Sequence, residues 1–280
     1  MSERILRVGM AQMLVEGGQP EANLRRAVAM IHDAATRGAA VVVLPECLDL
    51  GWTHPSARRL AQPIPGPHSD RLADAAIDAG VFVAAGLVER DGGRLYNAAV
   101  LISPEGQILL KHRKINELSI AFDLYETGSS LAVVETPLGC IGVDICADNF
   151  SNSLALGHAL GRMGAQVLLS PSAWAVPPDR DNQKDPYGGL WISSYTELAR
   201  LYEMPVIGVS NVGPMDAGVW AGMKCIGASI AVGHDGTLVR QLPYGERAEA
   251  LEVVEVTLVE RSLKGTSLCE ALAARGYHGP

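Results

Sequence analysis

The chain has 280 residues with a formal net charge of −8 at pH 7, and 48% of them are hydrophobic, so a sizeable core can form. The acidic balance excludes nucleic acid and an anionic membrane surface as expected partners, because both repel a negative protein. No apolar run approaches the ~20 residues that span a bilayer, and the first residues lack the apolar core of a signal peptide. We therefore expect a cytoplasmic protein.

The cysteines do not form a recognisable metal or disulfide pattern. They are scattered, and the sequence has no C-x-x-C pair, so neither a structural zinc site nor a disulfide framework is predicted. The thiols should be reduced, which leaves any one of them free to react. The cysteines are Cys47, Cys140, Cys146, Cys225 and Cys269.

In the first half of the chain, apolar runs alternate with helical periodicity. A short strand is predicted at residues 6–10, and a helix at 19–36 has Leu24, Val28 and Ile31 on one face before Gly38 ends it. The apolar run 39–44 reads as a buried strand. A helix at 69–79 and a strand at 81–87 follow. Turn residues then separate strands at 95–102 and 107–111, in a pattern typical of hairpins.

The second half continues the alternation to the C-terminus. Helices are predicted at residues 153–163 and 194–201. Strands are predicted at 131–135, 141–145, 167–170, 205–210, 228–232, 238–241 and 252–258. Helices between some strands and tight turns between others favour a mixed sheet or two packed sheets with helices outside, in a single domain. Residues 264–280 read as a tail with weak helical character at 267–275.

Three reactive side chains stand where predicted strands end. Glu46 follows the run 39–44 through Pro45, Lys114 follows the run 108–111, and Cys146 follows the run 141–145. Groups that leave neighbouring strands at one edge of a layered α/β domain converge on one crevice. A carboxylate, an amine and a thiol there are sufficient for acyl transfer by a cysteine nucleophile.

Each of the three groups has a chemical task in cleaving an amide-like C–N bond. Glu46 is the base that takes the thiol proton and passes it to the leaving amine. Lys114 and the backbone N–H of Ala147 hold the oxyanion of the tetrahedral intermediate. Because a helix N-terminus and a cation favour the thiolate, we expect the pKa of Cys146 to be depressed.

These motifs, in this order, resemble the nitrilase superfamily of carbon–nitrogen hydrolases from about residue 5 to residue 258. The matching stretches include Val8-Gly9-Met10-Ala11-Gln12, residues 38–46, Tyr96-Asn97-Ala98-Ala99, His112-Arg113-Lys114 and residues 142–148. The resemblance implies an α/β fold, a four-layer α-β-β-α sandwich with two mixed β-sheets, in a hydrolase domain of residues 1–263. It also implies a thioester intermediate, no cofactor and no metal, and a homodimer or larger homo-oligomer. Glu46, Lys114 and Cys146 would be base, oxyanion-stabilising lysine and nucleophile.

Departures from the family pattern bear on the substrate. Ala147 stands where an aromatic residue is common, and Cys146-Ala147-Asp148 differs from the Cys-Trp-Glu of nitrilases, which favours a small amide or N-carbamoyl substrate. Family members that bind an amino-acid carboxylate often have an arginine just after the cysteine. None is present here, so an N-carbamoyl amino acid is less expected as the substrate. A second family glutamate is predicted at Glu117, three residues after Lys114, with Glu126 as the alternative.

Three residues are candidates for the substrate pocket. Ser172 and Trp174, at a strand end, and Asn149, just after the nucleophile, are its candidates, whereas Trp191 and Trp220 are interpreted as packing or dimer contacts. The segment 177–189 is rich in Pro, Asp and Gly and reads as a surface loop, with a lid over the site as the alternative.

Four alternatives to a hydrolase of amides remain open from the sequence. They are a nitrilase, an acyltransferase that passes the same thioester to an amine, a Cys–His enzyme with His112 or His158 as base, and a catalytically silent binding protein. The first two keep all three motifs in use. The last two leave the Pro-Glu and Arg-Lys motifs without a role, so a cysteine-dependent carbon–nitrogen hydrolase is the prediction.

Overall fold

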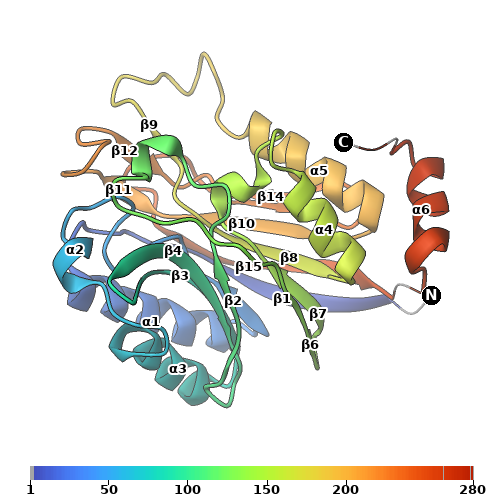
Figure 1. The fold of residues 1–280 in the computed structure, drawn as a ribbon, viewed down its shortest axis with the longest axis horizontal. Helices are drawn as coiled ribbons and strands as arrows, with labels where there is room; N and C mark the ends of the chain where they lie inside the picture. Colours follow the sequence, from blue (N-terminus) through green and yellow to red (C-terminus); the bar gives the residue numbers. More distant parts are fainter. Residues whose placement is uncertain (1–2, 261, 278, 280) are drawn as a thin grey trace.

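Two six-stranded mixed sheets packed face to face form the centre of the computed structural model, which describes residues 3–260, 262–277 and 279 (Figure 1). In spatial order, the first sheet consists of β15 (Ala250–Val259), β1 (Glu3–Gln12), β2 (Val41–Val43), β3 (Phe82–Asp91), β4 (Arg94–Ile102) and β5 (Ile108–Arg113). The second consists of β14 (Leu238–Gln241), β13 (Ile230–Val232), β10 (Val206–Ser210), β8 (Val167–Ser172), β7 (Gly139–Val143) and β6 (Val133–Thr136). A small third sheet joins β11 (Val212–Pro214), β12 (Lys224–Ile226) and β9 (Ala175–Val176).

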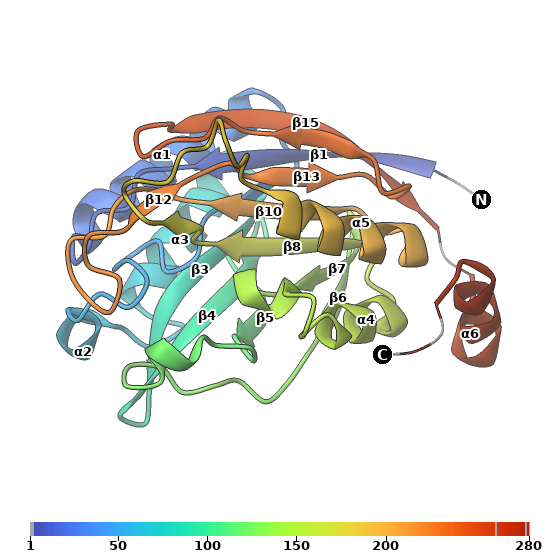
Figure 2. The same ribbon diagram turned by 90° about the horizontal axis from the view of Figure 1, so that it is seen from above.

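Helices cover the outer faces of both large sheets, which gives the four-layer α-β-β-α sandwich that was predicted (Figures 1 and 2). The first sheet carries α1 (Pro20–Thr36) and α3 (Pro67–Ala79), and the second carries α4 (Ala155–Met163) and α5 (Gly189–Tyr202). Short helical segments complete the fold: α2 (Ala57–Leu60), η1 (Ser119–Ala121), η2 (Cys146–Asn149) and the C-terminal α6 (Gly265–Ala274).

Strand β2 shows how the sequence sets up these layers. Val41 and Val43 face the second sheet and belong to the core between the sheets. Val42 and Leu44 point the other way and pack with Leu24 of α1. Side chains alternate across a strand, so a continuous apolar run is what a strand buried on both faces requires. The run therefore fixes β2 in the middle of the molecule and places the residues that follow it inside.

The C-terminal segment contains a helix that packs onto the core. Helix α6 begins slightly earlier than the predicted residues 267–275, and its Leu268 and Leu272 are buried in the main core cluster. Beyond the helix, Arg275 donates through Nη1 to the carbonyl of Leu201 at 2.5 Å and pairs through Nη2 with Glu203 at 2.6 Å. The helix lies at the end of the sandwich near α4 and α5 (Figure 2).

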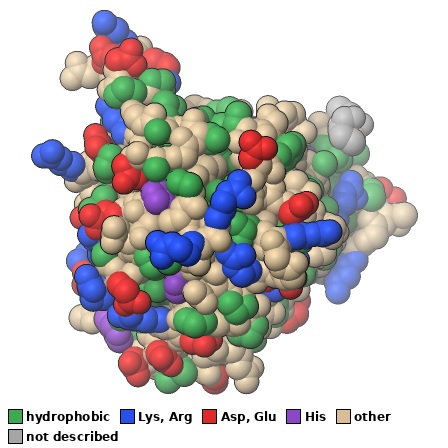
Figure 3. Space-filling model, turned by 60° about the vertical axis from the view of Figure 1, so that its left-hand side comes forward, with side chains coloured by type: hydrophobic (Ala, Val, Ile, Leu, Met, Phe, Trp, Pro, Cys, Tyr) green, Lys and Arg blue, Asp and Glu red, His purple; other side chains and the backbone are tan. Residues whose placement is uncertain are grey.

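The surface carries mixed charge. On the face in Figure 3, basic and acidic side chains are interspersed with apolar ones. Within the described part of the chain, no helix has both the length and the apolar character needed to cross a membrane.

Candidate active site

The structure brings the three predicted side chains into one cavity. Glu46, Lys114 and Cys146 come from the ends of β2, β5 and β7, and all three line a cavity of about 60 Å³. Their residues are almost fully enclosed, with exposed fractions of 1%, 2% and 8%. The backbone N–H of Glu46 donates to the carbonyl of Ser172 at 3.1 Å, so the first sheet is tied to the second beside the site.

A buried ammonium sits between two carboxylates. Lys114 Nζ lies 2.7 Å from Glu46 Oε1 and 3.4 Å from Glu117 Oε1, as the spacing of Glu117 from Lys114 indicated. Burial lowers the pKa of Lys114, but the charges of Glu46 and Glu117 outweigh it and hold that pKa well above its ordinary value. The lysine is therefore a fixed positive charge rather than a base.

Asn97 joins the two carboxylates and was not assigned a role from the sequence. Its side-chain amide donates to Glu46 Oε1 at 2.5 Å and to Glu117 Oε2 at 3.1 Å. Its carbonyl oxygen accepts the thiol of Cys47 at 3.4 Å, and its backbone carbonyl accepts the N–H of Lys114 at 2.8 Å. The Tyr96-Asn97 motif was visible in the sequence, but its partners lie on other strands.

Cys146, the predicted nucleophile, is held as a neutral thiol, which corrects the expectation of a depressed pKa. Burial, together with the negative charge of Glu46, raises the pKa of Cys146 well above its ordinary value, and Lys114 only partly offsets this. The cysteine opens the short 3₁₀ segment η2, whereas the helix expected to favour the thiolate, α4, begins only at Ala155. Burial likewise raises the pKa of Glu46, against the effect of Lys114. Both groups therefore hold a proton more tightly than usual, so the thiol proton can pass to the carboxylate as the sulfur attacks.

The backbone of Cys146 lies in the left-handed region, with φ of 46°. Residues with a Cβ adopt this conformation only where their surroundings impose it. Here the Cys146 N–H donates to Ser170 Oγ at 3.2 Å, and the buried carboxylate of Asp148 accepts the N–H groups of Ile145 at 3.1 Å and Asn116 at 2.7 Å. His112 Nε2 lies 2.8 Å from the same carboxylate. The turn that presents the thiol is thereby fixed from both sides.

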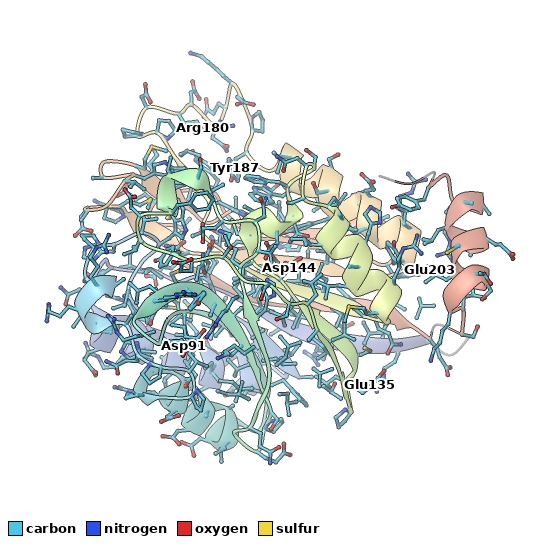
Figure 4. All side chains as sticks on the ribbon, in the orientation of Figure 1. Asp91, Glu135, Asp144, Arg180, Tyr187 and Glu203 are labelled. Atoms are coloured by element: carbon cyan, nitrogen blue, oxygen red, sulfur yellow. The ribbon has the colours of Figure 1, made fainter. Side chains whose placement is uncertain are left out.

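Asp144 and Asn149 form a buried polar layer behind the thiol. Asn149 Nδ2 donates to Asp144 Oδ1 at 2.7 Å and to Ser170 Oγ at 3.1 Å. Burial and the nearby charge of Asp148 raise the pKa of Asp144 to about 7. Asp144 lies deep inside the molecule (Figure 4). Neither Asn149 nor Ser172 lines the catalytic cavity, so their proposed contact with substrate is not what this geometry supports.

All four tryptophans of the chain line this cavity. Trp174 was a candidate pocket residue, and Trp174 and Trp191 stack with ring centroids 4.9 Å apart. Trp52 and Trp220 contact each other at 4.6 Å on another wall. Trp191 and Trp220, interpreted from the sequence as packing or dimer contacts, are therefore also pocket residues. Ala147 lines the cavity beside the nucleophile.

The loop that connects β9 to α5 ends against the aromatic wall. Arg180 lies out on this loop, whereas Tyr187 lies where the loop returns to the body of the sandwich (Figure 4). The Tyr187 hydroxyl accepts the indole N–H of Trp191 at 3.0 Å, and the Tyr187 backbone carbonyl accepts the amide of Gln241 at 2.9 Å. The loop's C-terminal end is thus anchored at the pocket.

Metal ligation and a Cys–His pair find no support in the part of the chain that is described. The described residues contain no group of three or more His, Cys, Asp or Glu side chains placed to hold a metal ion. The two histidines weighed as bases have other partners: His112 pairs with Asp148, and His158 bonds to the hydroxyl of Tyr202 at 3.0 Å.

The fold and the sequence are those of a known family. A family model described as carbon-nitrogen hydrolase matches residues 7–263, and the chain belongs to that family. Among curated relatives, the omega-amidase NIT2 of Xenopus tropicalis is 36% identical over 178 residues, which cover 60% of this chain and 63% of the relative. The match thus spans less than two thirds of that protein's length.

Solved structures share the fold at low sequence identity. A carbon-nitrogen hydrolase from Helicobacter pylori G27 superposes with a TM-score of 0.80 at 18% identity, covering 97% of this chain and 92% of the other. An amidase from Nesterenkonia sp. superposes with a TM-score of 0.74 at 20% identity, with 90% of each chain covered. Nit3 of Saccharomyces cerevisiae, a member of the nitrilase superfamily, superposes with a TM-score of 0.75 at 21% identity, covering 97% of this chain and 94% of the other. The predicted nitrilase-superfamily fold is confirmed.

Proposed function

We propose that this chain is a cysteine-dependent amidase that hydrolyses the C–N bond of a small linear amide through a thioester on Cys146. The observation that carries the proposal is the convergence of a thiol, a carboxylate and a doubly paired ammonium on one enclosed cavity. The curated relative named as an omega-amidase supports amide hydrolysis as the reaction class.

In the first half-reaction, Glu46 takes the thiol proton as Sγ attacks the carbonyl carbon of the amide. The carbonyl oxygen becomes an oxyanion, which Lys114 and the N–H of Ala147 stabilise. Because an amine leaves poorly unless it is protonated, Glu46 returns its proton to the nitrogen as the C–N bond breaks. Ammonia departs and the acyl group remains on Sγ as a thioester.

In the second half-reaction, water takes the place of the departed ammonia. Glu46 removes one of its protons while its oxygen attacks the thioester carbonyl, and the same oxyanion donors act again. Collapse of this intermediate breaks the C–S bond, releases the carboxylic acid and returns the proton to Sγ. Glu117 and Asn97 do not exchange protons in this scheme: they hold Lys114 and Glu46 in place.

The test is ammonia release from a panel of primary amides, carbamoyl compounds and nitriles, with wild type and Cys146→Ala compared. Loss of the nucleophile should lower turnover at least about 10⁴-fold. Cys140→Ala is the matched control, because Cys140 is also buried, belongs to β7, the strand that leads to Cys146, and lies outside the cavity. Turnover that survives in Cys146→Ala would refute the assignment of the nucleophile.

We further propose that residues 1–263 form the hydrolase domain and that residues 264–280 are a C-terminal tail packed onto it. The burial of Leu268 and Leu272 supports this packing. Assembly as a homodimer or larger homo-oligomer and a cytoplasmic location stay predictions. Light scattering on the purified protein tests the first of them.

A further inference from the structure

The walls of the catalytic cavity are apolar wherever they are not catalytic. Of the twelve residues that line it, three are Glu46, Lys114 and Cys146, and the other nine are apolar: the four tryptophans, Leu118, Phe150 and three alanines. Tryptophan is the largest side chain, and each brings a wide apolar face to a pocket. All four tryptophans of the chain line this one cavity, and this concentration calls for an explanation.

The positive charge of this cavity is already neutralised. Among the described residues that line it, Lys114 is the only cation, and its ammonium is shared by Glu46 at 2.7 Å and Glu117 at 3.4 Å. Two carboxylates against one ammonium leave the centre without a net positive charge. A carboxylate on the substrate would therefore be buried without a compensating charge, which is strongly unfavourable.

Other donors near the cavity do not supply the missing charge. Arg180, on the loop before α5, does not line the cavity: its guanidinium pairs with Asp185 at 2.7 Å and lies 5.5 Å from the ring centroid of Tyr187. The indole N–H groups of Trp52 and Trp174 are buried without a hydrogen-bond partner, but they are neutral and add no positive charge.

The size of the cavity limits the acyl group. A water molecule occupies roughly 10–15 Å³ of such volume, so a cavity of about 60 Å³ holds about four to six non-hydrogen atoms. The amide group itself takes about half of these. The acyl chain that fits has about two to four carbons, counting the carbonyl carbon.

We propose that the substrate of this site is an uncharged primary amide with a short apolar acyl group, and that acyl groups bearing a carboxylate are rejected. The inference rests on the proposed amidase function and deepens it. The tryptophans supply binding energy by apolar contact, while the neutral centre gives an anionic acyl group nothing to pair with.

A matched pair of substrates tests the charge rule. Malonamate and 3-methylbutanamide agree in heavy-atom number and in branching, and both are about one heavy atom larger than the volume of the cavity allows, so the cost of size is the same for each. They differ in carrying a carboxylate or an isopropyl group. We expect kcat/KM for the neutral amide to exceed that for malonamate by at least about 100-fold. Equal or faster turnover of malonamate overturns the inference while leaving the amidase function intact. If no amide of either kind releases ammonia, the proposed function falls and the inference with it.

The size rule is tested with acetamide, propionamide, butyramide and hexanamide under the same conditions. We expect kcat/KM to rise by about threefold to fourfold for each methylene while the chain still fits, and then to fall. A continued rise through hexanamide would contradict the volume argument.

A variant that adds a charge to the wall completes the test. Leu118 lines the cavity and is only partly buried, so Leu118→Lys introduces a cation with little disturbance of the core. We expect it to narrow the preference for 3-methylbutanamide over malonamate by at least about tenfold, whereas the uncharged control Leu118→Met leaves that preference within about threefold. A preference that does not respond to the added cation in a folded variant contradicts the electrostatic explanation.

Discussion

Asn97→Ala is the substitution whose effect follows most directly from the site's geometry. Asn97 is buried, and its amide donates to Glu46 at 2.5 Å and to Glu117 at 3.1 Å. A hydrogen bond to a charged group contributes about 1.5–3 kcal/mol, and 1.36 kcal/mol corresponds to about one pKa unit. Loss of the donor should therefore raise the pKa of Glu46, which burial already raises, by about one to two units further.

The assay is the pH dependence of kcat/KM, whose acidic limb reports the base of the free enzyme. Because Glu46 must be ionised to act, a higher pKa moves that limb to higher pH, by about one to two units in Asn97→Ala. Asn23→Ala is the matched control: Asn23 is also fully buried, but its amide donates to the backbone carbonyls of Glu16 at 2.7 Å and Asp49 at 3.0 Å. Both variants should lose stability, and only Asn97→Ala should shift the limb. An unshifted limb in an active Asn97→Ala enzyme would refute the positioning role.

Three further predictions follow from the same geometry. Glu117→Gln removes one of the two anions that hold Lys114, so steady-state kinetics should show kcat reduced about 10-fold to 100-fold with KM changed less than about threefold; a change in KM alone would contradict this. Asp144 has its pKa raised from 3.8 to about 7, so the folded state binds its proton more tightly than the unfolded state, and stability falls as pH rises through that window, by as much as about 4 kcal/mol. Thermal unfolding scans of wild type should show this fall and those of Asp144→Asn should not; identical pH dependence would exclude Asp144 as its source. Iodoacetamide at neutral pH should label the exposed Cys269 before Cys146, whose pKa burial raises; peptide mass mapping with the reverse order would contradict the neutral thiol.

The positions of the three candidate catalytic side chains could be predicted because each depends on local sequence. Apolar runs mark buried strands, and Glu46, Lys114 and Cys146 are where those runs turn polar. Glu117 was predicted by similar reasoning, since it lies three positions after Lys114. The layers followed from the alternation of strands and helices. These inferences needed only the spacing of apolar residues along each helix or strand and the position where that element ends.

The network around the site could not be predicted because it joins residues far apart in the chain. Asn97 stands 51 positions from Glu46 and 20 from Glu117, and nothing in the sequence near Asn97 names either partner. The tryptophans reach the cavity from four separate segments, so their common wall appears only once the chain is folded. The depressed pKa expected for Cys146 was wrong because desolvation, which depends on packing, outweighs the nearby cation.

In the proposed mechanism, amide cleavage passes through an acyl group on the sulfur of Cys146. The most direct test gives the enzyme either propionamide or methyl propionate in the presence of hydroxylamine, and measures the ratio of propionohydroxamate to propionate. The thioester formed from either donor is the same species, because the leaving group has already departed. The ratio should therefore be the same from the amide and from the ester. Different ratios would mean that the two donors share no acyl-enzyme, and the thioester mechanism would be contradicted.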